Sequence, residues 1–207
     1  MINLKLKTIA SLIEKDDIVL DVGTDHAFLP IYLMKNNLCK KVIASDISEN
    51  ALKSAKENIS KAKLKISLYL SDGIKNIKEK YNTLVIAGMG TNTIIDILKN
   101  QQLPNKIILS SNNHLDVLRK YMNEINYKII NEVVVKDKNK YYDIIVYQKG
   151  NELLSKSEIL YGKAKNKDYL NYLYQTKKEI YKKVNFPEKV KLFKQLWILK
   201  KLIKQKK

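Results

Sequence analysis

The sequence predicts an α/β domain built on a mostly parallel sheet, followed by a helical hairpin. Across residues 18–149, short β-branched runs alternate with longer amphipathic runs, which is typical of βαβ units. From residue 151 onward the strand signal almost disappears, and apolar residues recur at helical spacing. A chain of 207 residues has room for one domain of about 150 residues and an appendage. We therefore expect one domain over 1–150 and a second unit over 151–207.

The elements of the first domain follow from its apolar runs. We expect strands at 18–22, 41–46, 65–70, 84–88, 106–110, 127–135 and 141–148, and helices near 3–14, 28–36, 48–61, 91–99 and 114–125. The helix at 48–61 is the clearest, because Ser48 suits its N-cap and Ala51, Ala55 and Ile59 share one face. The last two strands follow each other directly, which predicts a hairpin. A parallel sheet that ends in such a hairpin is the layout of class I (Rossmann-like) methyltransferases, although hairpins also end other α/β sheets.

The second unit is basic and helical. Apolar residues between Leu153 and Val184 predict one long helix, and those from Val190 to Ile203 predict a second. Asn185, Phe186 and Pro187 separate them, with Pro187 at or near the first turn of the second helix. We expect an antiparallel, coiled-coil-like hairpin. Residues 151–207 hold 16 lysines and 5 acidic residues, a net charge of +11.

Charge and cysteine content limit the classes of partner. The whole chain has 39 basic and 21 acidic residues, so its net charge of +18 favours polyanions such as nucleic acid. Coding biased toward A and T explains 38 lysines against one arginine, but not the excess of lysine over acidic residues. A single cysteine, Cys39, excludes an internal disulfide framework, and no apolar run approaches the roughly 20 residues that span a bilayer. We expect a cytoplasmic protein that binds no membrane.

Loops that follow the first three strands carry the features of a nucleoside site. Gly23 stands where the first strand turns toward a helix, but the G-x-G-x-x-G fingerprint of dinucleotide sites is absent. Asp46 ends the second strand, where a carboxylate can accept hydrogen bonds from both ribose hydroxyls; the alternative is an ordinary acid near a helix N-terminus. Asp72 ends the third strand and can reach an adenine amino group. This set suits S-adenosylmethionine better than a dinucleotide.

The fourth and fifth strands end in residues that suit a methyl acceptor. Gly88 and Gly90 would let a substrate approach the backbone; the alternative is a tight turn that needs glycine only for its dihedral angles. Asn112, Asn113 and His114 close the fifth strand on the same face, or else cap the helix that follows.

Together these segments resemble the TrmK family, bacterial tRNA methyltransferases that modify N1 of adenine 22. The resemblance rests on LDVGTDHAFLPIYL (20–33), ASDISENALKSAKENI (44–59), SDG (71–73), VIAGMG (85–90), SNNHLDVLRKYM (111–122) and YYDIIVYQKG (141–150). The family also has a helical C-terminal domain. It often has a third glycine where Thr91 stands, and Gln-Pro where Ser110 and Ser111 stand. The resemblance implies a tRNA (adenine-N1)-methyltransferase that uses S-adenosylmethionine.

The resemblance and the strand-end pattern assign roles to individual residues. We expect the cofactor to be bound by Asp21, Gly23, Thr24, His26, Asp46, Ile47, Asp72, Gly73, Ala87, Gly88 and Met89. We expect the tRNA to be bound by Asn112, Asn113, Arg119, Lys177, Lys178, Lys182 and Lys183. Asp25 is the candidate catalytic residue, because its charge can support the cation that develops on the purine; the alternative is a capping acid.

Further expectations concern assembly and the competing functions. We expect a monomer. We expect no bound metal, because His26 has no cysteine or acid partners at metal-ligand spacing. Two other functions remain open: a class I methyltransferase that acts on a small molecule or a protein, and a non-catalytic RNA-binding protein.

Overall fold

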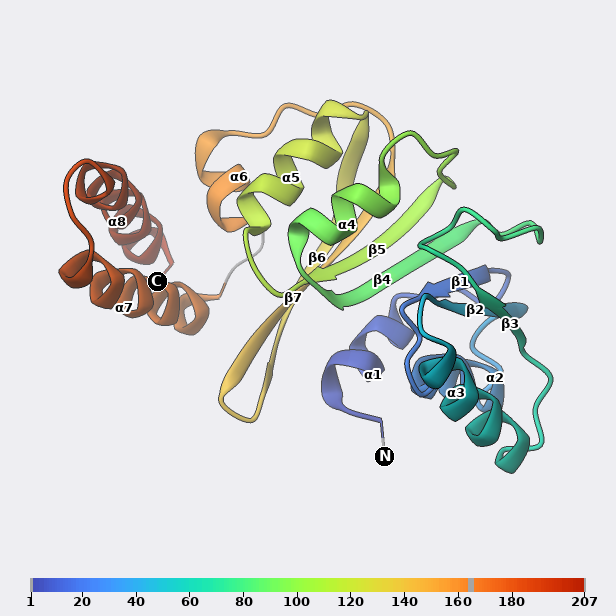
Figure 1. Ribbon diagram of the computed structural model, residues 1–207. Helices are drawn as coiled ribbons and strands as arrows, with labels where there is room; N and C mark the ends of the chain where they lie inside the picture. Colours follow the sequence, from blue (N-terminus) through green and yellow to red (C-terminus); the bar gives the residue numbers. More distant parts are fainter. Residues whose placement is uncertain (1, 164–165, 207) are drawn as a thin grey trace. The chain divides into compact units, whose positions relative to one another are not determined.

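The computed structural model describes residues 2–163 and 166–206. The chain divides into two compact units, an α/β unit, Met1–Glu152, and a helical unit, Leu153–Lys207. Figure 1 shows the order of their helices and strands along the chain. Within the described ranges, no helix has both the length and the apolar character needed to cross a bilayer.

A seven-stranded sheet forms the centre of the α/β unit. Its strands are β1 (Ile18–Val22), β2 (Lys41–Asp46), β3 (Ser67–Leu70), β4 (Thr83–Met89), β5 (Lys106–Ser111), β6 (Tyr127–Asp137) and β7 (Lys140–Lys149). They lie in the order β3-β2-β1-β4-β5-β7-β6. The first five strands are parallel, whereas β7 runs antiparallel between β5 and β6. This arrangement confirms the predicted Rossmann-like methyltransferase fold.

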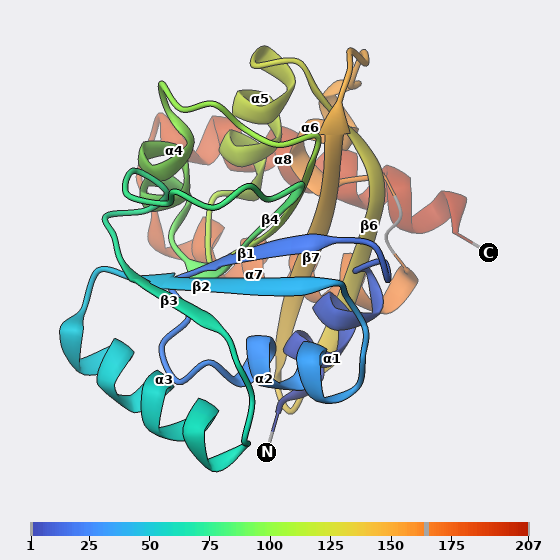
Figure 2. The same cartoon turned by 90° about the vertical axis from the view of Figure 1, so that its right-hand side faces the viewer.

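Helices cover both faces of the sheet, as Figures 1 and 2 show. One face carries α1 (Leu4–Ser11), α2 (Phe28–Lys35) and α3 (Glu49–Lys61), and the other carries α4 (Thr91–Leu98) and α5 (Leu115–Glu124). Because both faces are covered, β1, β4 and β5 consist largely of buried apolar residues. Helix α3 begins as expected, with the Ser48 hydroxyl accepting a hydrogen bond from the Ala51 amide at 3.3 Å. Because β1 to β5 are parallel, their carboxyl ends lie at one edge of the sheet.

The single arginine has a structural role that differs from the prediction. Arg119 lies on the buried side of α5 and is 1% exposed. Its Nη2 is 2.6 Å from Glu132 Oε1 on β6 and 3.5 Å from Asp143 Oδ1 on β7. The attraction of these two carboxylates keeps the pKa of Arg119 above its usual value, despite the opposing effect of burial. The prediction that Arg119 contacts the substrate is therefore wrong, because its guanidinium ties α5 to the antiparallel hairpin.

In the helical unit, the predicted long helix between Leu153 and Val184 is also wrong. Two helices occupy that span, α6 (Lys156–Tyr161) and α7 (Lys167–Lys183); residues 164 and 165 lie outside the described residues. Ser155 and Glu158 form a capping box at the start of α6, and Gly162 follows its end with φ +78°. Asn166 then caps α7 by accepting a hydrogen bond from the Tyr169 amide at 2.8 Å. The two N-terminal caps and Gly162 therefore divide the span into two helices, although its apolar residues continue at helical spacing.

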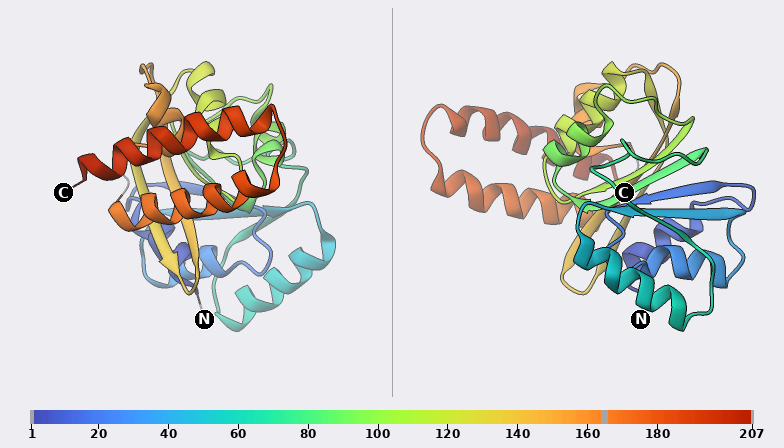
Figure 3. Two further views of the ribbon diagram at one scale, coloured as in Figure 1. Left: turned by 90° about the vertical axis from the view of Figure 1, so that its left-hand side faces the viewer. Right: turned by 45° about the vertical axis from the view of Figure 1, so that its right-hand side comes forward.

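Helices α7 and α8 (Glu188–Gln205) run antiparallel as a hairpin, which Figure 3 shows from two directions. Their seam contains the buried side chains of Leu170 and Leu199, which pack with Tyr161 of α6. The Tyr161 hydroxyl donates a hydrogen bond to the Gln195 carbonyl at 3.0 Å. The helical unit thus has a small core of its own.

Candidate functional site

A cavity of about 290 Å³ lies at the carboxyl ends of β1, β2, β3 and β4. Its lining consists of Val22, Gly23, Asp46, Ile47, Ser71, Asp72, Gly73, Lys75, Met89, Thr93, Asp96 and Ile97. Open α/β sheets bind ligands at this edge. The structure therefore brings together six of the predicted cofactor residues: Gly23, Asp46, Ile47, Asp72, Gly73 and Met89.

The loop after β1 favours glycine at its first position. Gly23 has φ +73°, and a Cβ added there would lie 2.1 Å from Met89 Cε. The amides of Gly23 and Thr24 both donate to the Ser45 carbonyl of β2, at 2.9 and 3.0 Å. The loop is thus held against the neighbouring strand, and the terminal methyl group of Met89 fills the space beside Gly23.

Asp46 is held in a fixed orientation by two backbone amides. Its Oδ1 accepts from Ser48 N and its Oδ2 accepts from Asp25 N, each at 3.0 Å. Because Ser48 caps α3, Asp46 is not the capping residue of that helix. Each carboxylate oxygen can accept a further hydrogen bond, so Asp46 can still receive two hydroxyl donors from a ligand.

Asp72 lines the cavity just after β3 and pairs with Lys75. The two side chains are 2.5 Å apart and more than half exposed. Such a surface ion pair contributes at most about 1 kcal/mol, so a ligand donor can replace Lys75 at little cost. Gly73 turns the chain away with φ +64°, and a Cβ there would lie 2.9 Å from Ile97 Cγ2. The third strand thereby ends against α4.

Five predicted cofactor residues lie outside the cavity lining: Asp21, Thr24, His26, Ala87 and Gly88. Asp21 is the most perturbed of them. Burial raises the pKa of Asp21 to about 6, and the nearby Asp46 carboxylate adds to this rise. The Thr24 hydroxyl and Lys5 act in the opposite direction, because they favour the ionised carboxylate.

Asp25 is exposed at the end of the same loop. Its backbone has φ +51°, and its Oδ1 lies 3.5 Å from His26 Nε2. Helix α2 begins after Ala27 without a hydrogen bond from any capping side chain. The alternative that Asp25 caps this helix is therefore wrong, and its carboxylate remains open to solvent beside the Asp46 anchor.

The two asparagines after β5 support the turn that follows β4. Asn112 Nδ2 donates to the Gly88 carbonyl at 2.6 Å, and Asn113 Oδ1 accepts from the Thr91 amide at 2.9 Å. The alternative that Asn112, Asn113 or His114 caps the next helix by its side chain is wrong, because His114 holds the N-cap position of α5 (Leu115–Glu124) without a capping hydrogen bond from its side chain. Thr91 Oγ1 also lies 2.9 Å from Ser111 Oγ. The hydroxyls of two residues that depart from the TrmK pattern are therefore hydrogen-bonded to each other.

The four predicted lysines of the helical unit differ in their surroundings. Lys178 and Lys183 are exposed, and Lys182 pairs with Glu179 at 2.7 Å. Lys177 is only half-exposed; its Nζ donates to Gln195 Oε1 at 2.9 Å and lies 5.9 Å from the Tyr161 ring centroid. Lys177 therefore contributes to the packing of its own unit.

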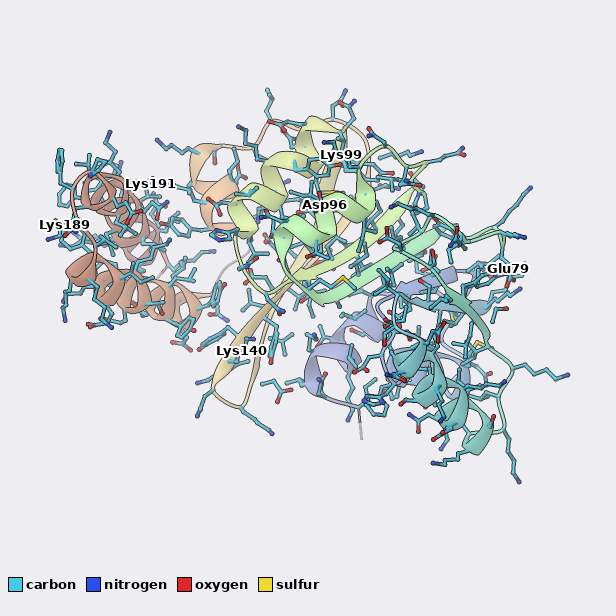
Figure 4. The ribbon with its side chains drawn as sticks, viewed as in Figure 1. Glu79, Asp96, Lys99, Lys140, Lys189 and Lys191 are labelled. Atoms are coloured by element: carbon cyan, nitrogen blue, oxygen red, sulfur yellow. The ribbon has the colours of Figure 1, made fainter. Side chains whose placement is uncertain are left out.

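Sequence reasoning missed half of the cavity wall: Val22, Ser71, Lys75, Thr93, Asp96 and Ile97. The last three lie at helical spacing on one face of α4, and Figure 4 labels Asp96 there. That spacing is visible in the sequence, but only the fold shows that this face borders the ends of the strands. Residues 2–163 and 166–206 contain no group of three or more His, Cys, Asp or Glu side chains suited to hold a metal ion.

Comparisons with known proteins agree with this geometry. Residues 2–145 match a family described as "Methyltransferase domain". The chain is 33% identical to the tRNA (adenine(22)-N(1))-methyltransferase of Bacillus subtilis over 153 residues, which cover 70% of this chain and 64% of that protein. It is 30% identical to Mycoplasma capricolum TrmK, solved with S-adenosylhomocysteine, with full coverage of both chains and a TM-score of 0.88.

A second solved relative binds the cofactor itself. The Streptococcus pneumoniae protein Sp1610, a putative tRNA (m1A22) methyltransferase in complex with S-adenosyl-L-methionine, is 30% identical and has a TM-score of 0.86. The match covers 98% of this chain and all of that chain. Because the likeness extends over both units, this chain belongs to the TrmK family of methyltransferases.

Proposed function

We propose that this protein transfers a methyl group from S-adenosylmethionine to N1 of adenine 22 in tRNA. The observation that carries the proposal is the cavity at the ends of β1 to β4, whose lining includes Gly23, Asp46 and Asp72. Gly23 lines the cavity without a side chain, and the flexible side chain of Met89 fills the space that its Cβ would occupy. The names of the relatives support the same reaction.

The cavity residues would hold the cofactor by its nucleoside. Asp46 would accept hydrogen bonds from both ribose hydroxyls, since two amides already fix its orientation. Asp72 would exchange Lys75 for the adenine amino group. Ile47 is 70% exposed at the rim, so its apolar side chain is available to cover the flat face of the base.

The chain's part in methyl transfer is positioning and charge support. When bound, S-adenosylmethionine supplies an electrophilic methyl group, which the neutral lone pair of adenine N1 can attack without prior loss of a proton. Positive charge then reaches the purine, and the exposed carboxylate of Asp25 would stabilise it. The target adenine must leave its helix to reach the strand ends, since N1 is engaged in a base pair.

The helical unit would bind the tRNA backbone. Its exposed lysines, including Lys178 and Lys183, together with Lys189 and Lys191 at the start of α8 (Figure 4), can contact phosphates. We propose that the enzyme works as a monomer in the cytoplasm, with Lys177 excluded from the phosphate contacts because it donates to Gln195.

The test uses two tRNA transcripts that differ only at position 22, one with adenine and one with guanine. Incubation with methyl-labelled cofactor should label the adenine transcript alone, and the Asp46→Ala variant should lose most of this activity at limiting cofactor. Equal labelling of both transcripts would refute the position. Labelling of a protein or a small molecule in place of tRNA would refute the substrate class.

A further inference from the structure

A half-buried lysine lies beside the end of β4, outside the residues assigned above. Lys5 of α1 has its Nζ only 3.2 Å from the point that a Cβ on Gly88 would occupy. Gly88 has φ +91° and accepts a hydrogen bond from Asn112 Nδ2 at its carbonyl. Under the proposed function, the methyl acceptor comes to the carboxyl edge of the sheet, where the end of β4 borders the cofactor cavity. Lys5 therefore places an ammonium group on the acceptor side of the site.

A second lysine shares the aromatic ring that supports Lys5. The Nζ of Lys5 lies 5.4 Å from the ring centroid of Tyr142, and the Nζ of Lys140 lies 5.2 Å from the same centroid. Lys140 begins β7 in the β6–β7 hairpin, where Figure 4 labels it. Asp137 Oδ2, at the end of β6, accepts from the Leu4 amide at 3.3 Å. This bond ties the start of α1 to the hairpin, so the two lysines come from elements that are joined.

The described residues give neither lysine of this pair a direct carboxylate partner. Among the described residues, no carboxylate lies within 4.0 Å of the Nζ of Lys5 or Lys140. Burial lowers the pKa of Lys5, the like charge of Lys140 lowers it further, and the buried Asp21 opposes both effects. Two neighbouring cations, one of them half-buried, raise the free energy of the protein unless an anion joins them. The arrangement is thus prepared for an anionic ligand.

We infer that Lys5 and Lys140 bind a phosphodiester group of the RNA strand that carries the target adenosine. The inference rests on the proposed function, because a nucleotide whose base reaches Gly88 brings its own backbone phosphates to the rim of the same site. The contact would fix the position of the extruded nucleotide, since phosphate contacts position a nucleic acid without reading its sequence. The carboxylate of the cofactor's methionine part is the other anion of similar chemistry, and the experiment separates the two.

The experiment compares Lys5→Gln, Lys140→Gln and Lys5→Arg in the full chain with a control, Lys56→Gln, an exposed position on α3. Binding of tRNA is measured over a range of salt concentrations, and binding of S-adenosylmethionine is measured by calorimetry. Each glutamine variant at the rim should weaken tRNA binding about threefold to tenfold near 0.15 M salt, and should reduce the salt slope by about 0.7–0.9. Lys5→Arg should restore both values, and cofactor affinity should stay within twofold.

Each result has a definite meaning. A Lys5→Gln variant that keeps the parental salt slope, while the parent binds and methylates tRNA, refutes this inference alone. A Lys5→Gln variant that loses cofactor affinity tenfold and keeps its tRNA affinity assigns Lys5 to the methionine carboxylate, which also refutes it. A parent chain that neither binds nor methylates tRNA refutes the proposed function together with this site.

Discussion

Replacing Arg119 by methionine tests the ion-pair network that joins α5 to the β6–β7 hairpin. Arg119, Glu132 and Asp143 are each 6% exposed or less, and the guanidinium lies 2.6 and 3.5 Å from the two carboxylates. Methionine fills a similar volume but leaves both carboxylates buried without their cation. Removing one partner of a buried ion pair costs about 3–5 kcal/mol. We expect Arg119→Met to lower the free energy of unfolding at pH 7 by that amount.

A matched control separates the buried network from the loss of any basic side chain on α5. Urea unfolding at pH 7 of Arg119→Met beside Lys120→Met, an exposed neighbour paired with Glu124 at 3.7 Å, measures the difference. A loss below about 1 kcal/mol for Arg119→Met would refute the reasoning.

Three further variants test Asp46 in the cavity and two acidic residues of β1 and its loop. The rise of the Asp21 pKa from 3.8 to about 6 corresponds to about 3 kcal/mol, so the free energy of unfolding should fall between about pH 4 and pH 6. Urea titrations of Asp21→Asn should no longer show this fall, and an unchanged pH profile would contradict the raised pKa. Asp25→Asn should slow single-turnover methyl transfer at saturating tRNA while cofactor affinity stays within twofold; a parental rate would exclude charge support. Asp46→Ala should weaken the binding of S-adenosylmethionine, measured by calorimetry, at least about tenfold, because two hydrogen bonds to a charged acceptor are lost. An unchanged affinity would show that Asp46 does not bind the ribose.

The strands and the hairpin at the end of the sheet could be predicted because their signals are local. The parallel strands are short runs rich in apolar residues, and Gly23, Asp46 and Asp72, at or just after the ends of β1, β2 and β3, border the cavity. Ser48 is a cap that the sequence shows directly. Positions at the ends of parallel strands converge in any doubly wound sheet, so Gly23, Asp46 and Asp72 could be grouped before the fold was known.

Arg119 and the break near Gly162 show where this reasoning fails. A lone arginine in a basic chain suggests an RNA contact, yet Arg119 lies one residue after buried Leu118 and three before buried Met122. Glu132 and Asp143 each interrupt an apolar strand, which was the available signal for inward-facing charges. In the helical unit, apolar spacing continues past Gly162, and only the capping box at Ser155 and the cap at Asn166 reveal two helices.

Identification of the methylated nucleoside is the most direct test of the proposed methyl transfer to adenine N1. The full chain is incubated with methyl-labelled S-adenosylmethionine and an unmodified tRNA transcript, the RNA is digested to nucleosides, and the labelled product is identified by mass spectrometry. We expect 1-methyladenosine as the labelled nucleoside, formed only when the cofactor is present. A different labelled nucleoside, or tRNA that stays unlabelled while the protein binds S-adenosylmethionine, would contradict it.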